Sequence, residues 1–211
     1  RTNILRKLIV DKSSSFCPSL PPSSGNTIIV DSGQASQLDE IVAGAASGTT
    51  ILLQDGTYSL NSNLIFATSK VTLRSQSGNR DAVILDGSYT IGEPVYISAS
   101  NITIADLTIQ RAYYHPIHIV GGGHQALLYN LHILDGIQQL VKVNSDGNGY
   151  ADFGTLACSL VEYTSAGRQQ IDTVLTGCYT NGFDALQSWG WTIRDNTFKE
   201  IHCDGRAAVA G

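Results

Sequence analysis

Four side chains able to move protons or hold charge share one place in a repeated sequence pattern. Tyr96, His118 and Lys142 each stand between two apolar residues, and Asp184 follows the apolar Phe183. Successive members of this set are 22, 24 and 42 residues apart. Histidine and lysine serve as general acids or bases, and a carboxylate can accept a proton or neutralise a cation. The four residues would form one reactive group if the fold stacked them.

The repeat itself predicts such stacking. EPVYISASNITIADLTI (93–109) aligns with HPIHIVGGGHQALLYNLHI (115–133), while LVKVN (140–144) and GFDALQSWGWTIRDNTF (182–198) repeat its first strand and the whole unit. A period of 22 to 24 residues with alternating apolar positions is typical of a solenoid whose strands pair in parallel with their copies. We therefore predict a parallel β-helix, with the four polar residues in an outward column at steps of about 4.7–4.9 Å. The long last interval predicts an excursion, EYTSAGRQQIDTVLTGCYTNG.

The segments before the repeat predict an arm and a cap. Residues 1–35 include the Ser- and Pro-rich stretch DKSSSFCPSLPPSSGN and are expected to form an N-terminal arm or linker. SQLDEIVAGAASG predicts a short capping helix that begins with a capping box of Ser36 and Asp39. Its apolar face comprises Leu38, Ile41, Val42 and Ala45. Residues 36–211 are expected to form a single β-helix domain.

Composition and spacing exclude several other classes of protein. A net charge of −5 over 211 residues lacks the basic stripe of a nucleic-acid binder, and no apolar run is long enough to span a bilayer. In HPIHIVGGG (115–123), the glycines are expected in a tight turn, because no helix or lysine follows to make a phosphate loop. His115 precedes the strand and a proline, so its side chain and that of His118 are expected to diverge and not to bind zinc together.

Several segments also resemble a known family. GTTILLQDGTY, YNLHILDGIQQLVKVN, ACSLVEYT and GFDALQSWGWTIRDNTF carry a likeness that covers residues 36–205. In these segments the chain resembles the pectate-lyase-like superfamily of right-handed parallel β-helices, and within it secreted bacterial β-helix repeat proteins. The resemblance implies a secreted, periplasmic or cell-surface protein that acts on polysaccharide or binds it. Such relatives often carry a histidine where this chain has Leu186, so their catalytic residues are not simply carried over.

The column and the resemblance together predict action on an acidic, uronic-acid polysaccharide by β-elimination or epimerisation. Removal of the C5 proton needs a base and a group that neutralises the carboxylate, and elimination also needs an acid for the leaving oxygen. Lys142 is the predicted base, and His118 and Asp184 complete the predicted catalytic set. The predicted substrate-binding residues are Tyr96, Asn144, Arg168 and Trp189.

Other interpretations of the column remain open. A glycoside hydrolase would use two carboxylates roughly 5–9.5 Å apart, and Asp184 has no second acid in its own column. A non-catalytic carbohydrate-binding or adhesin module would need exposed aromatic platforms, for which Tyr96, Tyr113, Tyr114 and Trp189 are candidates. The column could also be the ordinary polar surface of a solenoid.

No metal or cofactor is expected, although one loop could hold calcium. Asp146, Asn148 and Asp152 in SDGNGYAD offer oxygen ligands for Ca²⁺, while an ordinary turn explains the same residues. At the other extreme of the domain, the last coil would leave its apolar stack open. Further β-helix turns or a partner chain are therefore expected to cover it.

Cysteine spacing predicts one disulfide. Cys178 lies five residues before Phe183, and Cys203 lies five before Ala208, so the two cysteines should occupy equivalent corners of successive coils. One strand spacing is within the Cα separation of 4.4–6.8 Å that disulfides accept. Cys158 is expected inside a strand as a buried free thiol.

Overall fold

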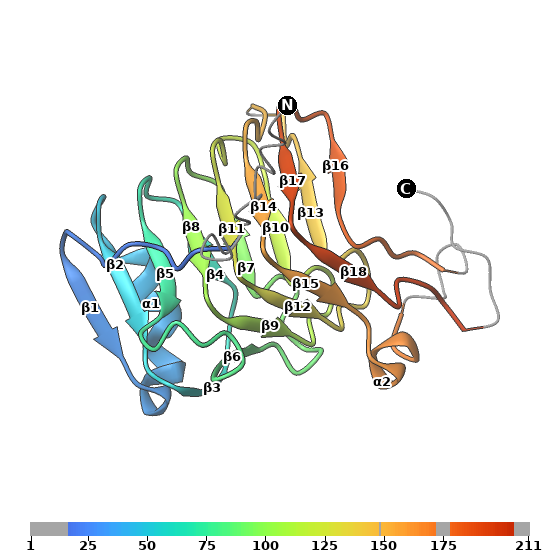
Figure 1. Ribbon diagram of the computed structural model, residues 1–211, viewed down its shortest axis with the longest axis horizontal. Helices are drawn as coiled ribbons and strands as arrows, with labels where there is room; N and C mark the ends of the chain where they lie inside the picture. The colour runs from blue at the N-terminus through green and yellow to red at the C-terminus, as the bar shows by residue number, and fades with distance from the viewer. Residues whose placement is uncertain (1–16, 148, 172–177, 205–211) are drawn as a thin grey trace, which may run out of the picture.

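The chain coils into three parallel sheets that run the length of the molecule. A computed structural model describes residues 17–147, 149–171 and 178–204 (Figure 1). Every pairing between the strands of these residues is parallel, and each strand pairs with its counterparts one coil away. The predicted right-handed parallel β-helix is confirmed. Its sheets are open and not closed into a barrel.

Within the described residues, the three sheets have seven, six and five strands. Sheet A contains β1 (Thr27–Val30), β2 (Thr50–Leu53), β5 (Thr72–Ser75), β8 (Thr103–Ala105), β11 (Leu127–Tyr129), β14 (Thr155–Ala157) and β17 (Thr192–Arg194). Sheet B contains β3 (Gly56–Ser59), β6 (Val83–Asp86), β9 (Thr108–Gln110), β12 (His132–Leu134), β15 (Leu160–Glu162) and β18 (Thr197–Lys199). Sheet C contains β4 (Leu64–Phe66), β7 (Val95–Ile97), β10 (Ile117–Ile119), β13 (Val141–Asn144) and β16 (Asp184–Leu186).

Apolar side chains of the three sheets fill one continuous core. In sheet A, for example, Ile104 of β8 pairs with Leu128 of β11, which pairs with Leu156 of β14, and none of the three is exposed. Alternate residues of each short strand therefore point inward, and those between them point to the outer face. This alternation places the predicted column on the outside of sheet C.

Left-handed residues turn the chain at the corners between sheets. At the corner from sheet C to sheet A, the φ angles of Asn101, Gln125 and Phe153 are 60°, 56° and 60°. Their amides donate to carbonyls of the next coil at 2.8 Å, so the corners stack as regularly as the strands do. Backbone groups thus remain paired where the strands stop.

A short helical cap covers the start of the core, and it begins earlier than predicted. The 3-10 helix η1 (Ser32–Gln37) leads into α1 (Leu38–Ala43). The capping box is formed by Asp31 and Gln34, so the prediction of Ser36 and Asp39 was wrong. The predicted apolar face is correct, since Leu38, Val42 and Ala45 are buried and Ile41 packs partly against the core. Strand β1 also lies before the boundary that we drew at residue 36, so the solenoid begins earlier in the chain.

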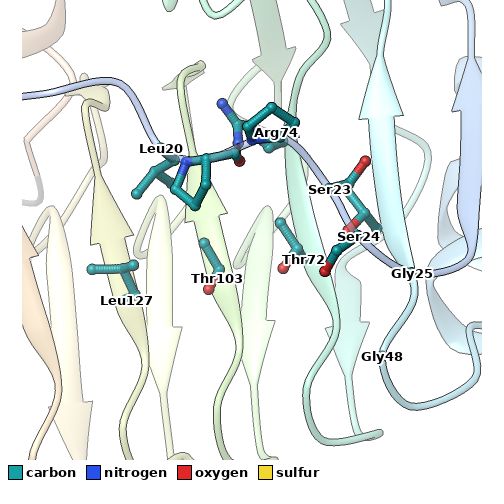
Figure 2. Close-up of a pocket in the computed structure, with 12 residues that line it drawn as sticks. Leu20, Ser23, Ser24, Gly25, Gly48, Thr72, Arg74, Thr103 and Leu127 are labelled. Atoms are coloured by element: carbon teal, nitrogen blue, oxygen red, sulfur yellow. Dashed lines mark hydrogen bonds between the residues drawn. The ribbon is translucent and has the colours of Figure 1, made fainter.

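Residues 17–26 form a strap across the outer face of sheet A (Figures 1 and 2). A disulfide joins Cys17 to Cys158 with a Cα–Cα distance of 5.7 Å. Leu20 packs against Ala105, Tyr129 and Ala157 on the sheet. Backbone carbonyls of the strap accept hydrogen bonds from Tyr129 Oη and Arg74 Nη1, at 2.5 and 2.9 Å. The strap is therefore fixed to the sheet by covalent, apolar and polar contacts.

The Cys17–Cys158 bond corrects the prediction that Cys158 is a free thiol. Cys158 does not lie inside a strand: β14 ends at Ala157, β15 begins at Leu160, and Cys158 has a φ of 59° at the corner between them. The corner interrupts the alternation that a continuous strand would show, and it places the thiol beside the strap. The other predicted bridge is confirmed, because Cys178 bonds to Cys203 with a Cα–Cα distance of 5.8 Å.

The predicted excursion leaves the solenoid after β15. It begins with the short helix α2 (Ser165–Arg168), and residues 172–177 lie outside the described part of the chain. In the described residues we find no helix with the length and hydropathy needed to cross a bilayer.

Candidate functional site

The predicted column exists on the outer face of sheet C. Strands β7, β10, β13 and β16 pair so that Tyr96 lies opposite His118, His118 opposite Lys142, and Lys142 opposite Asp184. Ile65 of β4 precedes them in the same register and is 46% exposed. The register prediction is therefore confirmed, and the column changes from apolar to charged along the helix axis.

Lys142 and Asp184 form a buried ion pair at the charged end of this column. The Lys142 ammonium donates to Asp184 Oδ2, and their side chains are only 11% and 6% exposed. Such a pair has lost most of its hydration, so each charge depends on the other for stabilisation. The hydrogen bond also gives a proton on Nζ a direct route to the carboxylate.

His118 lies between two oxygen acceptors. Its Nδ1 is 2.5 Å from Glu93 Oε1, and its Nε2 is 2.7 Å from Asn144 Oδ1. Asn144 is oriented by its own amide, which donates to the Ser145 carbonyl at 2.7 Å. A neutral imidazole carries a single N–H, so both bonds are made together only when the Glu93–His118 pair holds one additional proton. With that proton the pair can act as a proton store, and its His118 and Glu93 side chains are 15% and 20% exposed.

His115 contacts His118, although we predicted that the two would diverge. The ring centroids are 5.3 Å apart in an edge-to-face arrangement. His115 is buried, and Nδ1 lies 3.0 Å from the Gln139 carbonyl, to which it donates. Burial lowers the pKa of His115 to about 4, so its ring is neutral at pH 7. Within the described residues, no three His, Cys, Asp or Glu side chains form a group able to hold a metal ion.

Tyr96 completes the column on the side away from Lys142. Its ring meets that of His118 edge-to-face at 5.6 Å. Burial raises the pKa of the Tyr96 phenol, and the nearby carboxylates of Glu93 and Asp146 raise it further. The phenol therefore stays protonated at neutral pH and can donate a hydrogen bond.

The remaining predicted residues lie at different distances from the column. Asn144 contacts the column, because its Oδ1 lies 2.7 Å from His118 Nε2. Trp189 follows β16 in the turn toward sheet A and is 75% exposed. Arg168 lies in α2, where Glu200 and Asp204 accept hydrogen bonds from its guanidinium at 3.1 and 2.9 Å. The structure thus groups Asn144 with the column and places Arg168 in a separate ion-pair cluster.

One member of the site was missed by our sequence analysis. Glu93 stands two residues before β7, where His115 and Gln139 stand before β10 and β13. This second polar row belongs to the repeat but lies outside the alternation of apolar residues that marks the column. A search for polar residues at any repeated place would have found Glu93.

The predicted calcium loop is partly described. Asp152 Oδ1 accepts a hydrogen bond from the Trp189 amide at 2.8 Å, so this carboxylate holds two coils together. Asn148 lies outside the described residues.

Comparison with known proteins supports the fold. No family model matches the sequence, and no curated protein matches it. Among solved structures, the crystal structure of pectate lyase Pel9A superposes with a TM-score of 0.64 at 14% identity, covering 90% of this chain. The chain spans 58% of the length of that lyase. A pectin methylesterase from Aspergillus niger gives a TM-score of 0.43 at 13% identity, with coverage of 87% and 86%. The chain has a pectate-lyase-like parallel β-helix fold.

Proposed function

We propose that this protein acts on an acidic polysaccharide by removing the C5 proton of a uronate residue. The observation that carries the proposal is the in-register placement of Lys142 between His118 and Asp184 on the outer face of sheet C. The likeness in fold to pectate lyase Pel9A supports a polysaccharide as the substrate. The three side chains supply the base, the acid and the proton acceptor that the reaction needs.

In this proposal Lys142 becomes a base by giving its extra proton to Asp184. The proton moves along the hydrogen bond between Nζ and Oδ2. The free amine then takes the C5 proton, and the electrons of that bond form a C4–C5 double bond. The bond from C4 to the glycosidic oxygen breaks at the same time.

The leaving oxygen receives its proton from the Glu93–His118 store. Returning a proton to C5 from the opposite face, without loss of the leaving group, would give the epimer. Tyr96 and Asn144 flank His118 and are the proposed contacts of the reacting sugar. Arg168 would join them only by exchanging Glu200 or Asp204 for a substrate carboxylate.

We further propose that the protein works outside the reducing cytosol. Two disulfides, Cys17–Cys158 and Cys178–Cys203, support this location, because such bonds persist in oxidising compartments. A secreted, periplasmic or cell-surface place would also bring the protein to its polymer.

The test is incubation with a panel of uronans while three products are followed. Absorbance of the unsaturated sugar reports elimination, deuterium uptake at C5 from heavy water reports epimerisation, and reducing ends without absorbance report hydrolysis. Lys142→Met/Asp184→Leu removes the proposed base without leaving a lone buried charge. Lys199→Ala is the matched control, because Lys199 pairs with Glu162 on sheet B, away from the column.

Elimination or C5 exchange that is lost in the double variant and kept in Lys199→Ala supports the proposal. Hydrolysis alone, or activity that survives the double variant, overturns it. Binding of uronans without any of the three products also overturns it and favours the carbohydrate-binding alternative, which the exposed ring of Trp189 supports.

A further inference from the structure

We infer that Tyr150 and Trp189 form a stacking platform for a second sugar ring of the bound polysaccharide, several residues away from the reacting one. Both side chains line one hollow of about 310 Å³ together with Asp152, Gln187 and Ser188. We call these five residues the aromatic shelf. The inference deepens the proposed function and rests on it for the identity of the polymer.

The aromatic shelf exposes a large apolar surface. Trp189 is 75% exposed and Tyr150 57%, and the neighbouring Phe153 is 56% exposed. Rings in that state contribute little to the core, because apolar area stabilises the fold only when it leaves water. Exposed apolar patches rimmed by polar groups are typical of binding surfaces.

The backbone that carries the indole is held on both sides. The Trp189 amide donates to Asp152 Oδ1, and the Trp189 carbonyl accepts from the Phe153 amide, each at 2.8 Å. Phe153 also covers the next residue, since a Cβ on Gly190 would lie 2.8 Å from its Cε1. An exposed ring on a fixed backbone binds with a small entropic cost, because the main chain is already ordered.

The polar lining suits the hydroxyl edge of a sugar better than its carboxylate. Gln187 accepts a hydrogen bond from Ser145 through Oε1, which leaves its amide nitrogen to donate. Asp152 lines the same hollow, and a carboxylate there would repel a second anion. A pyranose ring matches this pattern, with an apolar face for the aromatic side chains and hydroxyls for the rim.

The aromatic shelf and the column belong to the same two strands. Lys142 and Asp184 lie in β13 and β16, and Tyr150 and Trp189 follow these strands in the turns toward sheet A. The hydrogen bond between Ser145 and Gln187 joins the two coils midway. Five residues separate Asp184 from Trp189, so at most about 17 Å of extended chain lies between them. An oligosaccharide that covers the column can therefore extend to the shelf.

The experiment measures the affinity of short and long uronan oligomers by titration calorimetry. Lys142→Met/Asp184→Leu serves as the inactive background, so that no oligomer is cut during the titration. Trp189→Ala and Tyr150→Ala are added to this background separately. Ile29→Ala is the matched control, since Ile29 is 53% exposed on β1 at the far edge of sheet A.

Trp189→Ala is expected to weaken the binding of long oligomers about tenfold and to leave that of short oligomers within twofold, as for a central aromatic contact. Trp189→Phe should recover part of the affinity. Equal losses for short and long oligomers, or a loss as large in Ile29→Ala, would overturn the shelf. If the native protein turns over uronans but Trp189→Ala binds long oligomers with unchanged affinity, the shelf alone is refuted. If Trp189→Ala loses affinity for long oligomers only, but the native protein shows no turnover, the proposed chemistry alone is refuted.

Discussion

Lys142 and Asp184 make a buried ion pair although 42 residues separate them in the chain. The pair exists because β13 and β16 are neighbours in sheet C, and the whole excursion through α2 lies between them in sequence. The two side chains are only 11% and 6% exposed, so each charge is sensitive to the loss of the other.

Lys142→Ala should therefore lower stability as well as activity. Removal of one member of a buried pair leaves an uncompensated charge, which costs about 3–5 kcal/mol. Lys142→Met/Asp184→Leu should recover most of that loss. Chemical denaturation of the three proteins checks this, and a single variant as stable as the native protein would contradict it.

The double variant Lys142→Met/Asp184→Leu separates the effect of the pair on stability from its effect on catalysis. If Lys142 is the base, the double variant should lose turnover on a uronan about 10²–10⁴-fold while remaining folded. Steady-state kinetics on the substrate found in the uronan panel provides the measurement. Turnover within threefold of native would remove Lys142 from the chemistry.

The buried His115 should make the stability of the protein fall at acidic pH. Its folded-state pKa of about 4 lies below the ordinary value of 6.5, so the folded protein binds fewer protons than the unfolded chain between these limits. Stability should fall as the pH drops from about 6.5 to 4, by about 3 kcal/mol in total, and this contribution should change no further below pH 4. His115→Asn keeps a donor for the Gln139 carbonyl and should remove this slope.

Denaturation across that pH range measures the effect. His202→Asn is the control, because the His202 side chain is 51% exposed. Identical slopes for the native protein and His115→Asn would show that His115 titrates normally. The carboxylates of Asp86 and Glu162 also have lowered pKa values. Their contributions are lost as the pH falls below the ordinary values of 3.8 and 4.5, so they overlap only the acidic end of the window and are common to the native protein and His115→Asn.

Gly122 should tolerate no side chain. It has a φ of 91°, and a Cβ there would lie 2.7 Å from the Ser98 carbonyl oxygen of the preceding coil. Gly48 has a similar φ of 86° with nothing within 4 Å, so it isolates the conformational cost. Gly48→Ala should cost about 1–2 kcal/mol and Gly122→Ala about 1–3 kcal/mol more. Urea unfolding checks this, and equal unfolding midpoints for Gly48→Ala and Gly122→Ala would contradict the steric explanation.

The Cys17–Cys158 bond should stabilise the fold more than Cys178–Cys203. Their sequence separations are 141 and 25, and loop-closure entropy gives about 5 and about 3.5 kcal/mol. Paired alanine substitutions at each bridge, compared by thermal unfolding, check the order. Removal of the first bridge should also speed hydrogen exchange in the strap at residues 17–26. Unchanged exchange there would show that Leu20 and Tyr129 hold it without the bond.

Sequence pattern predicted those features that the coil repeats. Val95, Ile117 and Val141 mark equivalent strands, so the column from Tyr96 to Asp184 followed from counting. The pattern did not reveal where strands stop, because a left-handed corner residue can be of many types. For that reason Cys158 was predicted inside a strand, and its bond to the strap was not predicted. Glu93 was missed because it stands before its strand, outside the alternation of apolar residues that marks the column.

The strap changes how the solenoid responds to tension. In a solenoid each coil contacts only its neighbours, so pulling on one end detaches coils in succession. Here a force applied at Cys17 passes through the sulfur atoms to Cys158, at the corner after β14. The strands from β1 to β14 lie inside that covalent loop and carry no load until the bond is reduced. The strap therefore makes most of the described solenoid, from β1 to β14, a mechanically shielded unit.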